Sequence, residues 1–298
     1  MYGDRARTKG SWPPSVSEHD HLDDLRAVTA GSLALDGLAP DAYARDHTAF
    51  EALSNQRRLI EDWLVDRLAS SSDASLSVLA VGCGDGALDA AVAERLLASD
   101  PAGRALRYVG IEPFETSARH FDERMGRINS DRLSFDTVVA PFAQTSLDET
   151  FDVVTFVHSM YYVPDVAEAA HAATALLRAG GEALVLNAPR GALNLLAGLL
   201  APAIEGHQQW FSDDVHNALT CSGLDVAVPA PIEAVVDLTD ASDGVLDFTV
   251  QATLTPESRC LVRRYLADVS LVAGRSVVAH PVDVFAVRGA RVRSSAVA

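Results

Sequence analysis

Residues 77–89 read SVLAVGCGDGALD, and this stretch decides the fold of the chain. A short apolar run leads into a turn that holds three glycines, and an alanine-rich helical pattern follows. The next strand pattern, YVGIE at 108–112, ends on the carboxylate Glu112. Glycines let a backbone pass close to a ligand, and a carboxylate after the neighbouring strand accepts hydrogen bonds from ribose hydroxyls. The two patterns together predict half of a nucleotide-binding fold.

The composition is that of one α/β domain of ordinary size. The chain has 298 residues, of which 48% are hydrophobic, and its formal net charge is -17, with Lys9 as its only lysine. Nucleic acids and anionic membrane surfaces both bind clustered basic residues, so we expect neither as a partner. The three cysteines are widely spaced and no leader-like apolar segment is visible, which favours a cytoplasmic protein without a disulfide framework. The oligomeric state is left open.

Strand and helix patterns alternate through the first two thirds of the chain. The strands are expected at 77–81, 107–111, 134–139, 152–157 and 182–187, with helices at 87–99, 115–126 and 165–178. This alternation predicts an α/β fold, a Rossmann-like doubly wound sheet that is mostly parallel, with a reversed last strand and a helical lid.

The rhythm changes after Pro189. The sequence there predicts a helix capped by Ser212, one strand across 225–238, helices at 244–252 and 256–271, and a final strand at 277–287. A helical period also runs through 41–69.

The glycine turn carries a resemblance to a known family. Its spacing is Gly-x-Gly-x-Gly rather than Gly-x-Gly-x-x-Gly, which argues against a dinucleotide. The turn resembles the first motif of class I S-adenosylmethionine-dependent methyltransferases, although most of those have an acid where this chain has Ala80. With Ile111-Glu112-Pro113, FDVV at 151–154 and HSMYYVPD at 158–165, it is similar to the histamine N-methyltransferase branch over about residues 45–288.

The sequence patterns predict a domain plan, and together with the resemblance they give a set of site residues. We expect a mobile segment at 1–40, one methyltransferase domain at 41–288 and a tail at 289–298. Within the domain, 41–69 form an N-terminal helix and lid, 75–189 the cofactor core, 190–250 a substrate lid with the sixth strand, and 251–288 the last helix and strand. The residues expected to hold S-adenosyl-L-methionine are Gly82, Gly84, Gly86, Glu112, Ser117, Phe142 and Val157.

The expected substrate residues are Gln56, Tyr161, Tyr162, His207 and Phe248. Gln56 stands where the histamine enzyme carries a glutamate that holds its cationic substrate. A neutral amide removes that charge complementarity, so histamine itself is not expected as the substrate.

Histidines are the candidate catalytic residues. His158 follows the fourth predicted strand, and His280 begins a reversed last strand, so both belong at the same sheet edge. Each one alone reads as a neutral hydrogen-bonding residue; together they suit proton removal, with His158 first and His280 second. Three imidazoles, with His207 as the third, also suit a divalent metal, but no helical His-x-x-x-His spacing supports one and we assign none.

These features predict a methyltransferase that acts on a small molecule, by N- or O-methylation, in bacterial specialised metabolism. Two alternatives stay open. One is metal-assisted C-methylation of an enolisable keto acid, motivated by the histidines. The other is a cofactor-binding scaffold without catalysis, motivated by Ala80 in place of the usual acid.

Overall fold

The computed structural model describes residues 35–70, 74–100, 103–201 and 210–288. Most of the predicted mobile segment 1–40, the tail 289–298 and His207 therefore lie outside the described residues. Within them, no helix is long and apolar enough to cross a membrane.

A mostly parallel sheet forms the centre of the molecule. Its parallel strands are β1 (Ser75–Val81), β2 (Ala105–Ile111), β3 (Leu133–Val138), β4 (Phe151–Val157) and β5 (Leu177–Asn187), in the order β3-β2-β1-β4-β5. β10 (Val282–Arg288) runs antiparallel to β5, and the short β6 (Asp225–Val226) and β7 (Ala230–Ile232) pair with β10. The predicted doubly wound sheet with a reversed last strand is confirmed.

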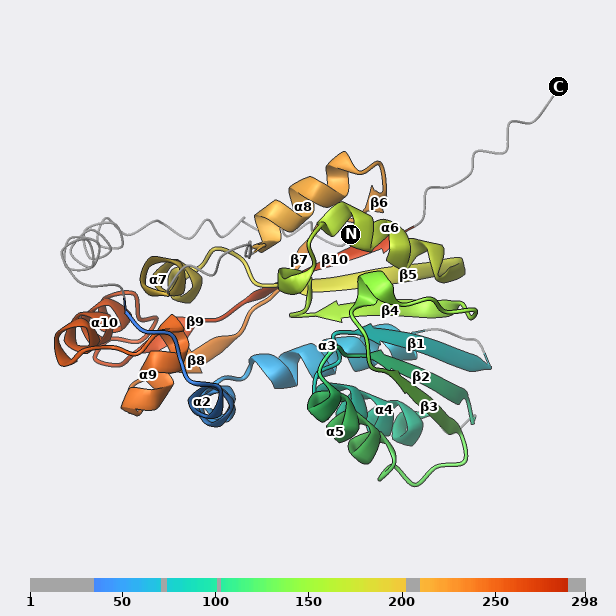
Figure 1. Ribbon diagram of the computed structural model, residues 1–298, viewed down its shortest axis with the longest axis horizontal. Coiled ribbons are helices and arrows are strands. Elements are labelled where there is room, and N and C mark those ends of the chain that lie inside the picture. Colours follow the sequence, from blue (N-terminus) through green and yellow to red (C-terminus); the bar gives the residue numbers. More distant parts are fainter. Residues whose placement is uncertain (1–34, 71–73, 101–102, 202–209, 289–298) are drawn as a thin grey trace, which may run out of the picture.

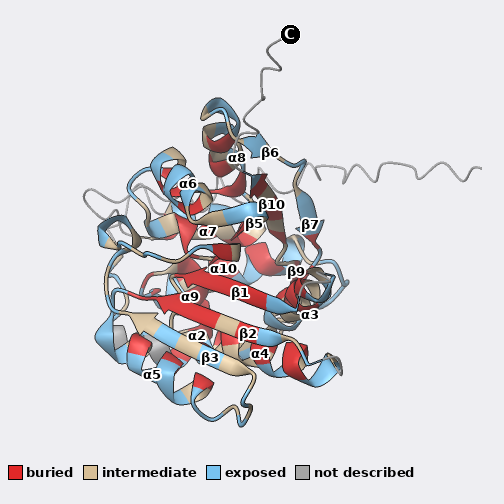
Figure 2. Cartoon of the chain, turned by 90° about the vertical axis from the view of Figure 1, so that its right-hand side faces the viewer, coloured by how far each residue is buried: buried red, intermediate tan, exposed pale blue. Residues whose placement is uncertain are grey.

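Helices cover both faces of this sheet (Figure 1). The helices α3 (Gln56–Ala69), α4 (Ala87–Ser99) and α5 (Glu115–Met125) lie on one face, and α6 (Val166–Ala175) and α8 (Ser212–Cys221) on the other. Alternate side chains of β1 enter the two cores, Val78 and Ala80 on the α3 side, Leu79 and Val81 on the α6 side. Figure 2 shows β1 buried along most of its length, as a central parallel strand must be.

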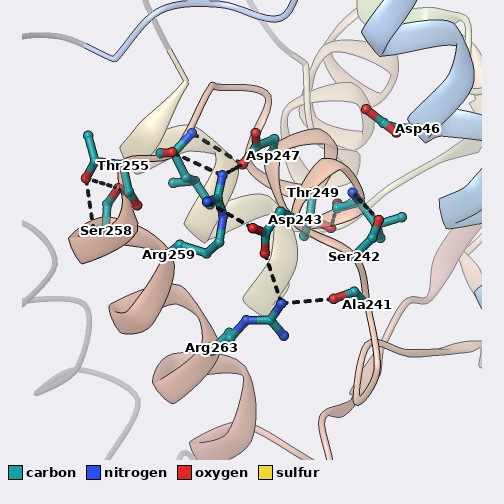
Figure 3. A network of polar contacts seen from close by, with 12 residues as sticks. Asp46, Ala241, Ser242, Asp243, Asp247, Thr249, Thr255, Ser258, Arg259 and Arg263 are labelled. Atoms are coloured by element: carbon teal, nitrogen blue, oxygen red, sulfur yellow. Dashed lines mark hydrogen bonds and ion pairs between the residues drawn. The ribbon is translucent and has the colours of Figure 1, made fainter.

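A second core lies beside the sheet, and we call it the lid after its predicted role. It is built from α2 (Pro40–Leu53), α7 (Ala192–Leu200), α9 (Asp243–Val250), α10 (Pro256–Asp268) and a hairpin of β8 (Val235–Asp237) and β9 (Val277–Ala279). Arg259 pairs with Asp243 at 3.2 Å and with Asp247 at 2.9 Å, which joins α10 to α9 (Figure 3). This part of the chain thus has its own hydrophobic core and its own ion pairs.

Two stretches that were each predicted as one strand are divided into several short strands. The run at 225–238 forms β6, β7 and β8, because Pro229 and Pro231 have no backbone N–H for a continuous ladder. The run at 277–287 is divided by His280 and Pro281 into β9, which belongs to the lid hairpin, and β10, which belongs to the main sheet. In place of the sixth strand expected within 190–250, β6 and β7 lie at the edge of the main sheet and β8 lies in the lid hairpin.

The helix boundaries also differ from the predictions. The helical period at 41–69 forms two helices, α2 and α3, separated at Ser54 and Asn55. The predicted helix 165–178 ends at Ala175, since β5 begins at Leu177. The N-cap of α8 is Phe211, whose N–H donates to the Asp214 carboxylate.

Candidate functional site

The glycine turn lies at the point where the sheet reverses its strand order. The chain passes from β1 outward to β2 and β3, then returns to β4 on the other side of β1. In such sheets the crevice outside the carboxyl ends of these two strands binds ligands. Here Ser159, just after β4, donates to the carbonyl oxygen of Val81 at 2.6 Å, so the two strand ends are held together.

Glycine is needed at the three positions of the turn for different physical reasons. All have positive φ, +68° at Gly82, +58° at Gly84 and +72° at Gly86. A Cβ on Gly82 would lie 2.5 Å from the Ser159 Cβ, and one on Gly86 would lie 2.6 Å from a ring carbon of Phe121. A Cβ on Gly84 would meet no atom within 4 Å. Packing therefore requires the outer two glycines, while Gly84 presents an open backbone on which a ligand can lie.

Glu112 is held beside Gly84. Its side chain is buried, with Oε2 accepting from Gly84 N at 3.0 Å and Oε1 from Phe114 N at 3.1 Å. Each carboxylate oxygen keeps further lone pairs after these bonds. The open face of Gly84 and this oriented carboxylate suit the ribose of a nucleoside cofactor, and their contacts with it stay predictions.

The remaining cofactor candidates lie on α5, on η1 and at the end of β4. Ser117 lies in the first turn of α5, and Val157 is the last residue of β4. Phe142 begins the short 3-10 helix η1 (Phe142–Gln144) and packs edge-on against Phe156, with ring centroids 5.5 Å apart. Their contacts with the cofactor stay predictions.

His158 is the centre of a hydrogen-bonded chain. It has a left-handed φ of 50°, a conformation that is uncommon outside glycine and gathers at functional sites. Its Nε2 lies 2.9 Å from Gln56 Oε1, and its Nδ1 lies 3.0 Å from the hydroxyl of Tyr161. The Tyr161 hydroxyl also accepts from Ala188 N at 2.8 Å. His158 is thus engaged at both ring nitrogens.

The same chain reaches His280, between β9 and β10. Gln56 Nε2 donates to the carbonyl oxygen of His280 at 2.6 Å, and His280 Nδ1 lies 2.8 Å from Ser54 Oγ. The two histidines are therefore connected through Gln56, at the edge where both were expected.

Electrostatics keep both rings neutral. Burial lowers the pKa of His158 to about 4, and the positive field of Arg57 and His47 acts in the same direction. Burial and the neighbouring His158 lower the pKa of His280 to about 4 as well. Burial raises the pKa of Tyr161 well above its ordinary value. Near pH 7 this cluster therefore consists of uncharged donors and acceptors.

Aromatic rings of the lid form the neighbouring wall. The Phe248 ring centroid lies 5.2 Å from those of Tyr43 and Phe50 and 5.3 Å from that of His47. Phe248 itself is buried in the lid core, so its predicted contact with substrate stays a prediction. Tyr43, His47 and Phe50 were missed from the sequence, although their spacing places them on one face of a helix.

Tyr162 reaches toward the lid. It ends the 3-10 helix η2 (Met160–Tyr162), is 70% exposed, and forms a side-chain hydrogen bond with Tyr43 of α2. Tyr161, in contrast, turns its hydroxyl to His158. The adjacent tyrosines thus have different partners, His158 for Tyr161 and Tyr43 for Tyr162.

The described residues give the metal hypothesis no support. Within 35–70, 74–100, 103–201 and 210–288, no three or more His, Cys, Asp or Glu side chains gather as metal ligands. His207, the third candidate ligand, lies outside these ranges.

A nucleoside crevice of this form, below a helical lid, is typical of Rossmann-like transferases. The family model described as "Methyltransferase domain" matches residues 52–227, more than half of the chain, and the chain belongs to this family. It is a methyltransferase that uses S-adenosylmethionine as its methyl donor.

Solved structures share the fold. The YcgJ protein from Bacillus subtilis is 11% identical, with a TM-score of 0.53 over 77% of this chain and 97% of that one. A putative methyltransferase from Bacillus halodurans is 14% identical, with a TM-score of 0.50 over 75% of this chain and 95% of that one. At these identities the likeness concerns the fold alone. No curated protein sequence matches the chain significantly.

Proposed function

We propose that this methyltransferase acts on a neutral or anionic small molecule with a planar ring, and methylates it at oxygen or nitrogen. The observation that carries the proposal is the Gln56–His158–Tyr161 chain, which lies beside the cofactor crevice and below the aromatic wall of the lid. Such a chain can orient an acceptor hydroxyl or amine and receive its proton.

The charges near His158 favour this substrate class. Arg57 and His47 both act on His158 with a positive field. The nearby Glu51 carboxylate is already paired, with Arg57 at 2.9 Å and with His47 at 3.6 Å. A cationic substrate would therefore find no unpaired carboxylate in this group to bind it. Gln56 supports the same conclusion, because its amide binds His158 and the His280 backbone rather than offering a negative charge.

The lid favours a planar substrate. Tyr43 is 39% exposed, and its ring packs against Phe248 and stacks near His47. Aromatic faces bind flat rings by offset or edge-on packing. The resemblance to the histamine N-methyltransferase branch, with Tyr161 and Tyr162 as pocket residues, belongs to this proposal, as do cytoplasmic location and a role in bacterial specialised metabolism.

Each part of the chain then has a task. S-adenosylmethionine supplies an electrophilic methyl group whose carbon–sulfur bond breaks with the electron pair left on sulfur. Glu112 and the open backbone at Gly84 hold its nucleoside, and the lid aligns the acceptor and keeps water away. His158 and Tyr161 hold and move the acceptor proton.

The test is methyl transfer from labelled S-adenosylmethionine to separate sets of phenols, aromatic carboxylic acids and aromatic amines, with S-adenosylhomocysteine release measured in parallel. We expect turnover with neutral or anionic aromatic acceptors and weaker turnover with permanently cationic ones. Labelling of nucleic acid or protein in place of every small molecule, or a clear preference for cations, would overturn the proposal.

A further inference from the structure

The orientation of the Gln56 amide is determined by its surroundings. Its nitrogen lies 2.6 Å from the carbonyl oxygen of His280 and 3.5 Å from that of Pro281. A carbonyl oxygen only accepts, so the NH2 group must face these two oxygens. The amide oxygen Oε1 therefore faces His158 and can only accept from it.

This orientation sets the tautomer of His158. Because Oε1 accepts, Nε2 of the neutral imidazole carries the hydrogen, and Nδ1 is left with its lone pair. Tyr161 has the complementary arrangement. Its oxygen accepts from Ala188 N at 2.8 Å, so its own hydrogen is free to point at Nδ1, 3.0 Å away. Toward a substrate, the Tyr161 oxygen can then only accept.

We propose that Gln56 is a positioning residue that holds His158 with Nδ1 unprotonated, so that Tyr161 and His158 relay the acceptor's proton away from the reaction. This inference rests on the proposed function, because it deepens the role of the same site. In it Tyr161 touches the substrate, His158 lies behind Tyr161, and Gln56 lies behind His158.

Atoms and charge balance in this relay. The acceptor oxygen or nitrogen forms a bond to the methyl carbon as the carbon–sulfur bond of the donor breaks, with the electron pair remaining on sulfur. The acceptor's proton passes to the Tyr161 oxygen while the Tyr161 proton passes to His158 Nδ1. Tyr161 ends neutral, His158 ends as imidazolium, and its Nε2–H still donates to Gln56.

A neutral amide at position 56 lets the relay reset. Arg57 from α3 and His47 from α2 both lower the pKa of His158, and His280 lies near it as well. Their effect opposes a lasting imidazolium, so His158 returns its proton through Tyr161 once the product has left the site. A carboxylate in place of the amide would stabilise the imidazolium, and Nδ1 would stay occupied.

The direct test is the tautomer of His158, measured by nitrogen-15 NMR of histidine-labelled protein and assigned by loss of the signal in His158→Asn. We expect a protonated Nε2 and an unprotonated Nδ1 in the intact protein. Gln56→Met keeps the side-chain length but removes the amide, so its spectrum should show a mixture of tautomers. Gln144→Met, on an exposed glutamine of η1, is the matched control. A protonated Nδ1 in the unchanged protein, or an unchanged tautomer in Gln56→Met, would refute the inference.

Kinetics provide a second readout. Tyr161→Phe removes the first carrier and should lower kcat by ~100-fold without a change in S-adenosylhomocysteine affinity. Gln56→Glu should move the acid limb of the kcat–pH profile to higher pH. Asn55→Asp adds the same charge one position away and keeps the acceptor for Val235 N, so it should leave the profile in place. Full kcat in Tyr161→Phe, or an unmoved limb in Gln56→Glu, would contradict the relay.

The two proposals fail separately. If no small molecule is methylated, the proposed function fails while the NMR result still decides the role of Gln56. If a small molecule is methylated but the tautomer is wrong, only the relay fails.

Discussion

Gly84→Ala separates the cost of folding from the cost of binding. Gly84 has φ +58°, where a side chain costs about 1 kcal/mol, but the added methyl group would meet no atom within 4 Å. The variant therefore loses only the free energy needed to hold an alanine at this positive φ. We expect the free energy of unfolding, measured by urea titration, to fall by about 1 kcal/mol with the cooperative transition intact.

The effect on the cofactor should be larger. The methyl group occupies the open face over which a nucleoside would pass, beside the Glu112 carboxylate. Forcing an extra methyl into a packed contact costs roughly 1–3 kcal/mol. Calorimetry with S-adenosylhomocysteine should thus show binding weakened by roughly 5- to 150-fold.

Two other glycines provide controls. Gly223 has φ +79° and also meets no atom within 4 Å, but it lies between α8 and β6, so Gly223→Ala should match the loss of stability with unchanged binding. Gly82→Ala would place its Cβ 2.5 Å from that of Ser159 and should destabilise the fold far more. If Gly84→Ala binds S-adenosylhomocysteine as tightly as the unchanged protein, the cofactor does not lie over Gly84.

Further predictions concern charge and pH. Glu112→Gln has one acceptor oxygen in place of two and loses the charge that strengthens bonds to a ribose, so calorimetry should show S-adenosylhomocysteine binding weakened by roughly 10- to 100-fold; unchanged affinity would remove Glu112 from the site. His158 and His280 have pKa values lowered to about 4 from 6.5, so the unfolded chain takes up protons first. The stability that these neutral rings contribute is complete above pH 6.5 and should fall as the pH drops toward 4, as urea titrations across this range would show. His280→Asn should reduce the slope of the unfolding free energy against pH, and an equal slope in that variant would argue against a contribution from His280. The contribution of Asp89 to stability changes with pH in the opposite direction. Burial raises its pKa to about 6, so its ionised form destabilises the fold above that pH. Asp89→Asn keeps an acceptor for the Tyr108 hydroxyl, so its stability relative to the unchanged protein should be higher at pH 8 than at pH 5, and the reverse order would exclude a charged buried Asp89.

Much of the cofactor half of the site is predictable from sequence. The glycine turn follows a strand pattern, and Glu112 ends the next one, so their meeting at a sheet edge follows from the rules for parallel strands. His158 was placed at the same edge for the same reason. These signals lie within short segments, where covalent geometry and alternating burial determine the local structure.

The lid is less predictable. The run at 277–287 has the period of one strand, yet Pro281 divides it between two sheets. The spacing of Tyr43, His47 and Phe50 predicts a helix face but does not say that this face meets Phe248. Periodicity shows that a side chain is turned inward, without identifying which distant element it packs against.

The sequence alone determined the class of fold and the donor cofactor, and it predicted the edge of the sheet at which chemistry takes place. Only the tertiary structure decided what Gln56 does. It is 102 residues from His158 and 224 from His280, and its amide links the two. The physical reason is that an amide has two different ends, and its role depends on which groups surround it after folding. Local patterns carry no information about such neighbours.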